Sequence, residues 1–67
     1  MKNRISELRK ARGWTQEELA DRVGVTRQTI ISLESGRYNA SLLLAHKLAV
    51  CFETAIEALF IFEEGAP

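Results

Sequence analysis

The 67 residues suffice for one domain, and their 46% hydrophobic content is that of a folded chain rather than a disordered one. A single cysteine excludes an internal disulfide, no apolar run approaches the roughly 20 residues that span a bilayer, and no signal peptide is visible, so we expect a cytoplasmic protein. The net charge is zero but unevenly spread: residues 1–38 hold eight basic and five acidic residues (+3), and residues 39–67 hold one and four (−3).

Hydrophobic spacing predicts that the chain begins with a helix. We expect this helix from residue 3 or 4 to Arg12, because Ile5, Leu8 and Ala11 recur at three-residue spacing. Gly13 then occupies the position that commonly ends a helix.

The second helix has a complete start signal. Thr15 is a good N-cap, and Glu18 three residues later completes a capping box. Trp14 and Leu19 flank this start as a hydrophobic staple. We expect the helix to run to about Val23.

A third helix is expected after Thr26, which serves as its N-cap, and before Gly36, which stops it. Ile30 and Leu33 point inward. Polar and aliphatic side chains gather on the opposite side of this helix, at Arg27, Gln28, Ile31 and Ser32.

Two further helices complete the prediction. Asn39 is expected to cap a helix over residues 40–52. Its predicted core positions are Leu42, Ala45, Leu48, Ala49 and Phe52. A capping box at Thr54 predicts a fifth helix to residue 59 or 60. The apolar run over residues 60–62 then either extends that helix or forms a short strand with residues near 2–4.

Residues 16–34 place two short helices around a tight turn at Gly24, where glycine can adopt a positive φ. Two short helices joined in this way form a helix-turn-helix, which usually places its second helix in the DNA major groove.

Three segments resemble the phage-repressor-like (lambda repressor and Cro, XRE-type) family: Thr15-Gln16-Glu17-Glu18-Leu19-Ala20, Gly24-Val25-Thr26-Arg27-Gln28-Thr29-Ile30 and Glu34-Ser35-Gly36-Arg37-Tyr38-Asn39. The similarity runs from about Ile5 to Phe60 and is closest to small stand-alone regulators such as the cytolysin repressor. It implies one all-α, five-helix DNA-binding domain over residues 1–67, and it favours the strand over residues 60–62. It also implies a structural ion pair between Arg9 and Glu34.

The helix-turn-helix predicts double-stranded DNA as a partner, and the basic half of the chain agrees with that, although a random scatter of surface charge would look similar. Predicted base contacts are Arg27, Gln28, Ile31 and Ser32. Predicted backbone contacts are Gln16, Thr26, Thr29, Arg37, Tyr38, Asn39 and Arg12. The alternatives are that Ile31 edges the core and that residues 37–39 form a plain loop.

Apolar side chains outside the predicted core stripes indicate a twofold homodimer built mainly by residues 54–64. The predicted interface residues are Leu43, Val50, Cys51, Phe60, Ile61 and Phe62.

The function expected from these features is transcriptional regulation, most simply by a prokaryotic, homodimeric repressor that reads a near-palindromic operator. The alternative is an antitoxin or interaction module that holds a partner protein on its apolar C-terminal surface. No zinc-ligand spacing, phosphate-binding glycine loop or catalytic triad is present, so we expect no enzyme, no metal, no cofactor and no small-molecule substrate. His46 and Cys51 are interpreted as packing or interface residues.

Overall fold

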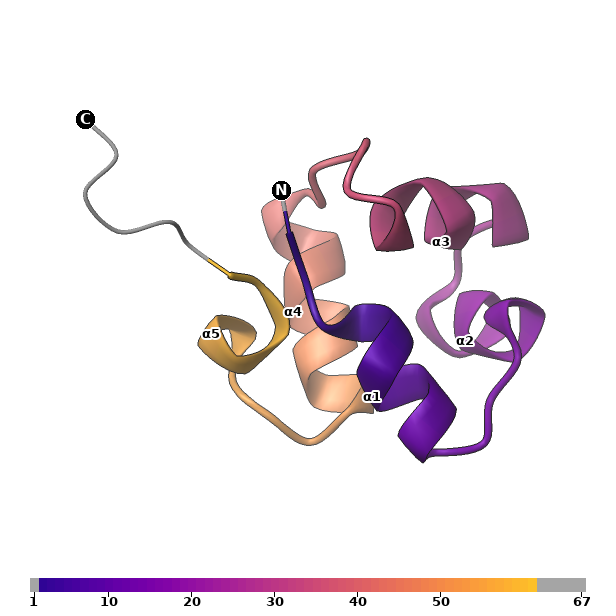
Figure 1. Cartoon of the computed structure of the whole chain (residues 1–67), viewed down its shortest axis with the longest axis horizontal. Helices are drawn as coiled ribbons and strands as arrows, with labels where there is room; N and C mark the ends of the chain where they lie inside the picture. The colour runs from indigo at the N-terminus through magenta and orange to yellow at the C-terminus, as the bar shows by residue number, and fades with distance from the viewer. Residues whose placement is uncertain (1, 62–67) are drawn as a thin grey trace.

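A computed structural model describes residues 2–61 and contains five helices in that range (Figure 1). The helices are α1 (Ile5–Ala11), α2 (Gln16–Val23), α3 (Arg27–Glu34), α4 (Leu42–Cys51) and α5 (Ile56–Leu59). The all-α, five-helix prediction is therefore confirmed. Figure 1 places α5 on the side of α4 that faces away from α3.

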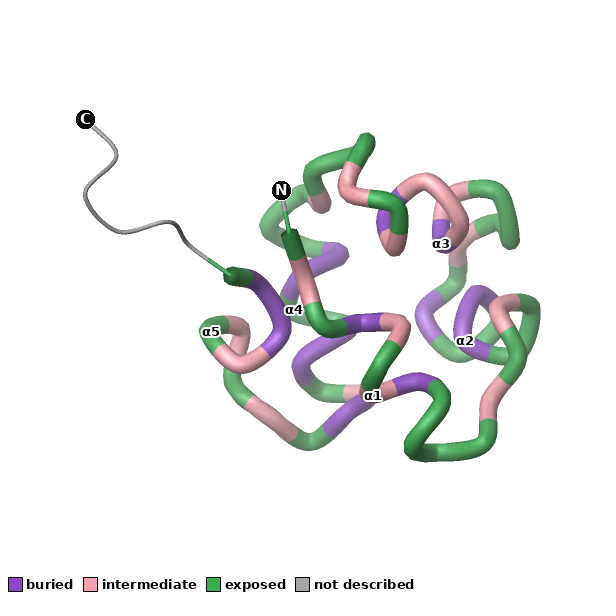
Figure 2. Tube along the Cα trace, viewed as in Figure 1, coloured by how far each residue is buried: buried purple, intermediate pink, exposed green. Residues whose placement is uncertain are grey.

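One hydrophobic core joins the five helices, and every helix contributes buried residues to it (Figure 2). The largest fully buried side chains are Ile5, Leu19, Ile30, Leu33, Leu48 and Leu59. Because Ile30 and Leu33 are both among them, α3 is anchored to the core along one side and leaves its other side outward.

The start of α2 forms as its sequence predicts. The Thr15 hydroxyl accepts a hydrogen bond from the Glu18 backbone N–H at 3.0 Å, and the Glu18 carboxylate accepts one from the Thr15 N–H at 3.0 Å. At the other end, Gly24 takes a φ of +73°, and the predicted turn into α3 is confirmed. This cap and this turn fix where α3 begins relative to α2.

Replacing Thr15 with alanine should lower the free energy of unfolding by about 1 kcal/mol, because it removes the acceptor for the Glu18 N–H. Urea denaturation followed by circular dichroism measures this. Thr54→Ala is the matched control, since α5 has no side-chain cap, and it should change stability less. Equal losses from the two substitutions would contradict this account of the cap.

The same capping box makes stability depend on acidic pH. The backbone N–H of Thr15, and then its hydroxyl, hold the pKa of Glu18 below its ordinary value of 4.5. A carboxyl whose pKa is lower in the folded state stabilises the fold above its unfolded pKa, and that contribution is lost as the pH falls through the folded value. With Glu18→Gln, the free energy of unfolding should therefore decrease less steeply as the pH falls below about 4.5.

Helix α4 begins later than the sequence predicts. Its N-cap is Ser41, whose hydroxyl accepts a hydrogen bond from the Leu44 N–H at 3.1 Å, so Asn39 is not the cap. With this start, Leu44 is buried and Leu42 is 81% exposed, which makes the prediction of Leu42 as a core residue wrong. The other four predicted core positions of this helix are buried.

Helix α1 and helix α5 also differ from their predictions. Ala11 is exposed rather than inward, while Ile5 is buried and Leu8 is half-buried. The N-cap of α5 is Ala55, without a side-chain hydrogen bond, so Thr54 does not form the expected capping box. The helix spans a single turn.

The end of the described chain pairs with its beginning. Asn3 and Phe60 form an antiparallel bridge. The Arg4 N–H donates to the Leu59 carbonyl at 2.7 Å, and the Ile61 N–H donates to the Lys2 carbonyl at 2.9 Å. The predicted pairing with residues near 2–4 is therefore present as an isolated bridge, and the helix extension is wrong. Residues 62–64 of the predicted dimerisation segment lie outside the described residues.

Candidate nucleic-acid interface

The outer side of α3 carries the four residues predicted to contact bases. Arg27 and Gln28 are exposed in its first turn, whereas Ile31 and Ser32 are half-buried one turn later. Ile31 follows Arg27 by four positions and therefore lies on the same side of the helix as Arg27. The four side chains share one side of a helix whose opposite side is locked into the core.

Thr26 and Thr29 bind each other at the start of α3. Their hydroxyl oxygens lie 2.9 Å apart, and the Thr26 hydroxyl also accepts a hydrogen bond from the Thr29 N–H at 3.2 Å. These bonds cap the helix and restrict both hydroxyls. The two threonines also border a shallow groove of about 160 Å³, together with Gln28, Ser32 and Tyr38.

The loop that follows α3 exposes Arg37, Tyr38 and Asn39. Gly36 begins this loop with a φ of +81°, as expected for the residue that ends the helix. Because Tyr38 borders the groove along α3, the loop and the helix form one continuous surface.

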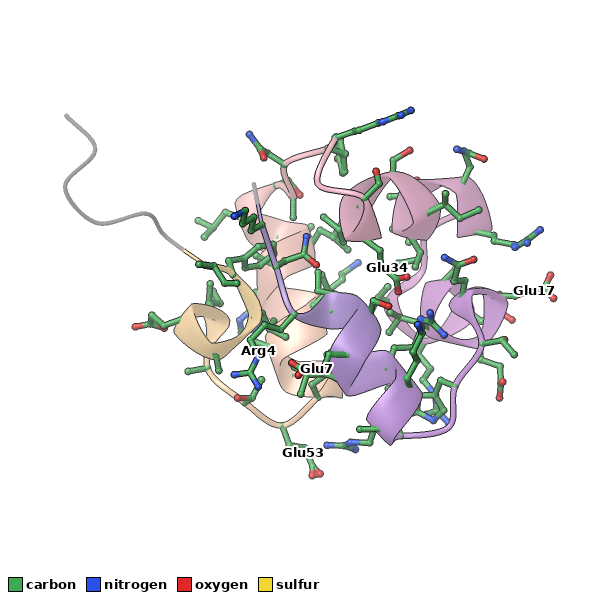
Figure 3. All side chains as sticks on the ribbon, in the orientation of Figure 1. Arg4, Glu7, Glu17, Glu34 and Glu53 are labelled. Atoms are coloured by element: carbon green, nitrogen blue, oxygen red, sulfur yellow. The ribbon has the colours of Figure 1, made fainter. Side chains whose placement is uncertain are left out.

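Gln16, the first residue of α2, meets the last residue of α3. Its side-chain amide donates a hydrogen bond to the Glu34 carboxylate at 3.2 Å. Figure 3 shows Glu34 pointing from α3 toward α1 and α2, while Glu17 points outward. The sequence predicted Gln16 at this edge but not its bond to Glu34.

The ion pair implied by the family resemblance is present. Arg9 Nε lies 2.7 Å from Glu34 Oε2, and the two side chains are 10% and 8% exposed. Arg9 Nη1 also donates to the Trp14 carbonyl at 2.7 Å. The pair therefore joins α1, the start of α2 and the end of α3 around one buried carboxylate.

Arg12 lies away from this surface, contrary to the sequence prediction. Its guanidinium donates to the Phe52 carbonyl at 2.9 Å and lies 5.5 Å from the centre of the Trp14 ring. Arg22 covers the same ring at 4.2 Å. Because Arg12 caps the end of α4, it does not belong with the residues on α3.

Asn3 is a neighbour of the site that no sequence pattern indicated. Its amide nitrogen donates to the Leu33 carbonyl at 2.7 Å, and its amide oxygen accepts from the Ile5 N–H at 3.1 Å. Asn3 thus ties the end of α3 to the start of α1. Such a bond across 30 residues has no local sequence signal.

The residues predicted at a dimer interface differ in how far they are exposed. Leu43, Val50 and Ile61 are exposed, at 63%, 62% and 44%. Phe60 is buried in the core of its own chain, so it leaves the predicted interface, and Phe62 lies outside the described residues. Cys51 is half-buried at the edge of the core.

His46 and Cys51, whose side-chain types can act as a base and a nucleophile, border an open groove between α2 and α4. His46 is exposed and Cys51 is half-buried there, and the groove measures about 830 Å³. Burial raises the pKa of the Cys51 thiol above its ordinary value of 9.0, against the opposing influence of Arg22 and Arg12. A thiol that stays protonated at neutral pH is a poor nucleophile.

Within residues 2–61, no three His, Cys, Asp or Glu side chains gather in a way that would hold a metal ion. None of the helices in that range is both long enough and apolar enough to cross a membrane.

The arrangement of α2 and α3 has counterparts in known proteins. A sequence model described as helix-turn-helix matches residues 5–59. The chain belongs to the helix-turn-helix family. Its XRE-type members include the small repressors that the sequence resembles, and the resemblance is confirmed.

Curated relatives of this helix-turn-helix chain match nearly its whole length. An HTH-type transcriptional regulator of Archaeoglobus fulgidus is 56% identical over 64 residues, which cover 96% of this chain and 91% of the relative. One from Methanothermobacter thermautotrophicus is 58% identical over 65 residues, covering 96% and 94%. The regulator YgzD of Bacillus subtilis is 48% identical, covering 96% and 97%. These relatives do not favour the antitoxin alternative.

Solved structures agree with the helix-turn-helix fold. The restriction-modification controller protein C.AhdI of Aeromonas hydrophila superposes with a TM-score of 0.78 at 38% identity, covering 85% of this chain and 86% of that one. The N-terminal DNA binding domain of SinR from Bacillus subtilis gives 0.77 at 26% identity, covering 94% and 91%.

Proposed function

We propose that this helix-turn-helix protein is a transcriptional regulator, most simply a repressor, that binds specific double-stranded DNA as a homodimer. The observation that carries the proposal is the outer side of α3, where Arg27 and Gln28 are exposed on a helix anchored by Ile30 and Leu33. Its solved neighbours, a controller protein and a DNA binding domain, and its curated relatives support it.

In this proposal the first turn of α3 reads base edges in the major groove. Gln28 can pair its amide with adenine, and Arg27 can offer two donors to guanine or one to a phosphate. Ile31 supplies an aliphatic surface that suits a thymine methyl group. Ser32 completes the contacts one turn later.

Backbone contacts would flank these on both sides. Gln16 lies at the start of α2, where unpaired backbone N–H groups and the helix dipole attract a phosphate. Arg37, Tyr38 and Asn39 lie in the exposed loop on the other side. Thr26 and Thr29 line the groove between these contacts, while Arg12 is excluded because it caps α4.

Two copies would associate through the exposed apolar side chains of α4 and the C-terminal segment. Leu43 and Val50 lie about two helical turns apart on α4 and share one side of it, and Ile61 adds a third exposed apolar side chain. A twofold dimer would set two α3 helices about 34 Å apart, the spacing of successive major grooves.

Selection of bound sequences from random duplex DNA tests the proposed function. We expect enrichment of a near-palindrome whose half-sites are centred about 10 base pairs, or a multiple of that, apart. A pool that stays random after repeated rounds would contradict specific binding. Enrichment of an isolated half-site would contradict the proposed dimer but not specific DNA binding.

The dimer has its own test. Sedimentation at tens of micromolar should give the mass of two chains, and Val50→Glu should give one, because it buries a charge in the interface. The Val50→Glu variant should also bind the full operator more weakly, since its two half-sites are no longer bound by one linked dimer. Ala11→Glu adds the same negative charge at an exposed position on α1, so it is the control and should leave the dimer intact. A wild-type monomer would refute the assembly.

A further inference from the structure

The carboxylate of Glu34 accepts hydrogen bonds from two different residues. Arg9 Nε binds Oε2 at 2.7 Å, and Arg9 Nη2 reaches Oε1 at 3.3 Å. Oε1 also receives the side-chain amide of Gln16 at 3.2 Å. A structural ion pair between α1 and α3 needs only the first partner, so the bond to Gln16 calls for a separate explanation.

We propose that Glu34 is a positioning residue for DNA binding, which holds the Gln16 amide in place for a phosphate. This inference rests on the proposed function. A side-chain amide nitrogen has two hydrogens, and the bond to Glu34 uses one of them, which leaves the other for a phosphate oxygen. Glu34 itself remains behind the surface, because its side chain is 8% exposed.

The start of α2 is held on both of its sides by this pair. Arg9 binds the Trp14 carbonyl, just before the Thr15 cap, and Glu34 binds the Gln16 side chain just after it. Fixing a long side chain costs conformational entropy, and here that cost is met before DNA arrives. In the free protein the Gln16 side chain would therefore already be in position for the phosphate.

The pair also links two kinds of contact. Glu34 is the last residue of α3, the helix that reads bases, and its carboxylate fixes the residue that grips the backbone. The distance between the base contacts and the phosphate contact is thus set by one side chain. A shift of α3 in the groove would move the phosphate contact with it.

A double-mutant cycle on the duplex recovered by selection tests this role. Gln16→Ala should weaken binding about tenfold, the value of one hydrogen bond to a charged group. Glu34→Gln should weaken it several-fold in the wild-type background and have little further effect when Gln16 is already alanine. Equal losses in both backgrounds would mean that Glu34 acts through the fold alone, and this would overturn the proposal.

Charge provides the matched control. Glu34→Gln removes a negative charge beside DNA, which by itself should strengthen binding. Glu17→Gln makes the same change of charge next to Gln16 in the first turn of α2, on a side chain that points outward (Figure 3). We expect Glu17→Gln to maintain or raise affinity. If Glu34→Gln raises affinity as Glu17→Gln does, the positioning role is refuted.

A second measurement locates the contact on the DNA. Single phosphates are replaced with neutral methylphosphonates, and the loss of affinity is measured at each position. At one position in each half-site, this loss should be present with the wild-type protein and absent with both Gln16→Ala and Glu34→Gln. At the other positions the loss should be the same for all three proteins. Glu34→Asp shortens the reach to Gln16 but keeps a charge for Arg9, and it takes the place of Glu34→Gln if that variant does not fold. An unchanged phosphate pattern in the Glu34 variant would overturn the proposal. If the wild-type chain selects no duplex, the proposed function is overturned as well. The selection experiment on the wild-type protein shows this before any variant is made.

Discussion

Glu34→Ala should lower the free energy of unfolding by about 3–5 kcal/mol. The reason is that Arg9 would remain buried with its charge unpaired, and Gln16 would lose its acceptor. Because a domain of this size holds only about 5 kcal/mol of stability, the variant should retain no more than about 2 kcal/mol at 25 °C. Urea denaturation in the presence of a stabilising osmolyte measures the change.

The cycle of Arg9→Ala and Glu34→Ala separates coupling from two independent losses. We expect the double variant to be less destabilised than the sum of the two single variants by more than about 1 kcal/mol. The exposed pair of Arg4 and Glu7, 2.8 Å apart, is the control, since its side chains are 51% and 65% exposed. Its coupling should stay below about 1 kcal/mol. Additive losses at the buried pair would refute the ion pair as a structural link.

Gln28→Ala should remove the preference for one base position in each half-site and leave the others. One well-formed pair of hydrogen bonds to adenine contributes about 1–3 kcal/mol of discrimination, so the preferred base would lose its advantage by roughly tenfold or more. Selection from random duplex DNA, repeated with the variant, reports this position by position.

Arg37→Ala is the contrasting control for that experiment. A residue that contacts only phosphate should weaken binding to all duplexes alike and reduce the slope of log affinity against log salt by about 1. The selected sequence should be unchanged. If Gln28→Ala also lowered binding uniformly, with every base preference kept, Gln28 would be a backbone contact and not a base contact.

The parts of the fold that the sequence predicted correctly are those with local physical causes. The capping box of Thr15 and Glu18 and the positive φ of Gly24 depend on residues within one turn of each other. The position of α3, and therefore the outward side of Arg27 and Gln28, follows from these two features. This is why the candidate interface could be outlined before its structure was known.

Predictions failed where the sequence offered two equivalent choices. Asn39 and Ser41 are both good caps, and Leu42, Leu43 and Leu44 form an unbroken apolar run, so periodicity could not decide which leucine points inward. Packing decides it, and Leu44 is the buried one.

Other failures came from contacts between distant parts of the chain. Arg12 is 40 positions from the Phe52 carbonyl that it caps, and its positive charge alone suggested a phosphate contact. Phe60 was expected at a dimer interface because the pairing of its segment with residues near 2–4 does not reveal which side chain of the segment enters the core of its own chain. Glu53, two residues after the end of α4, has a φ of +55°, a conformation that glycine adopts more readily, and no sequence pattern marks it.

We expect the outer side of α3 to fit base edges. Competition binding at physiological salt tests this most directly, with a labelled selected duplex displaced by unlabelled selected duplex, by a scrambled duplex or by heparin. We predict that the selected duplex competes at least a thousandfold better than the scrambled one, as specific DNA-binding proteins do. Equal displacement by the scrambled duplex and by heparin would mean that the protein responds only to negative charge, and would contradict the claim.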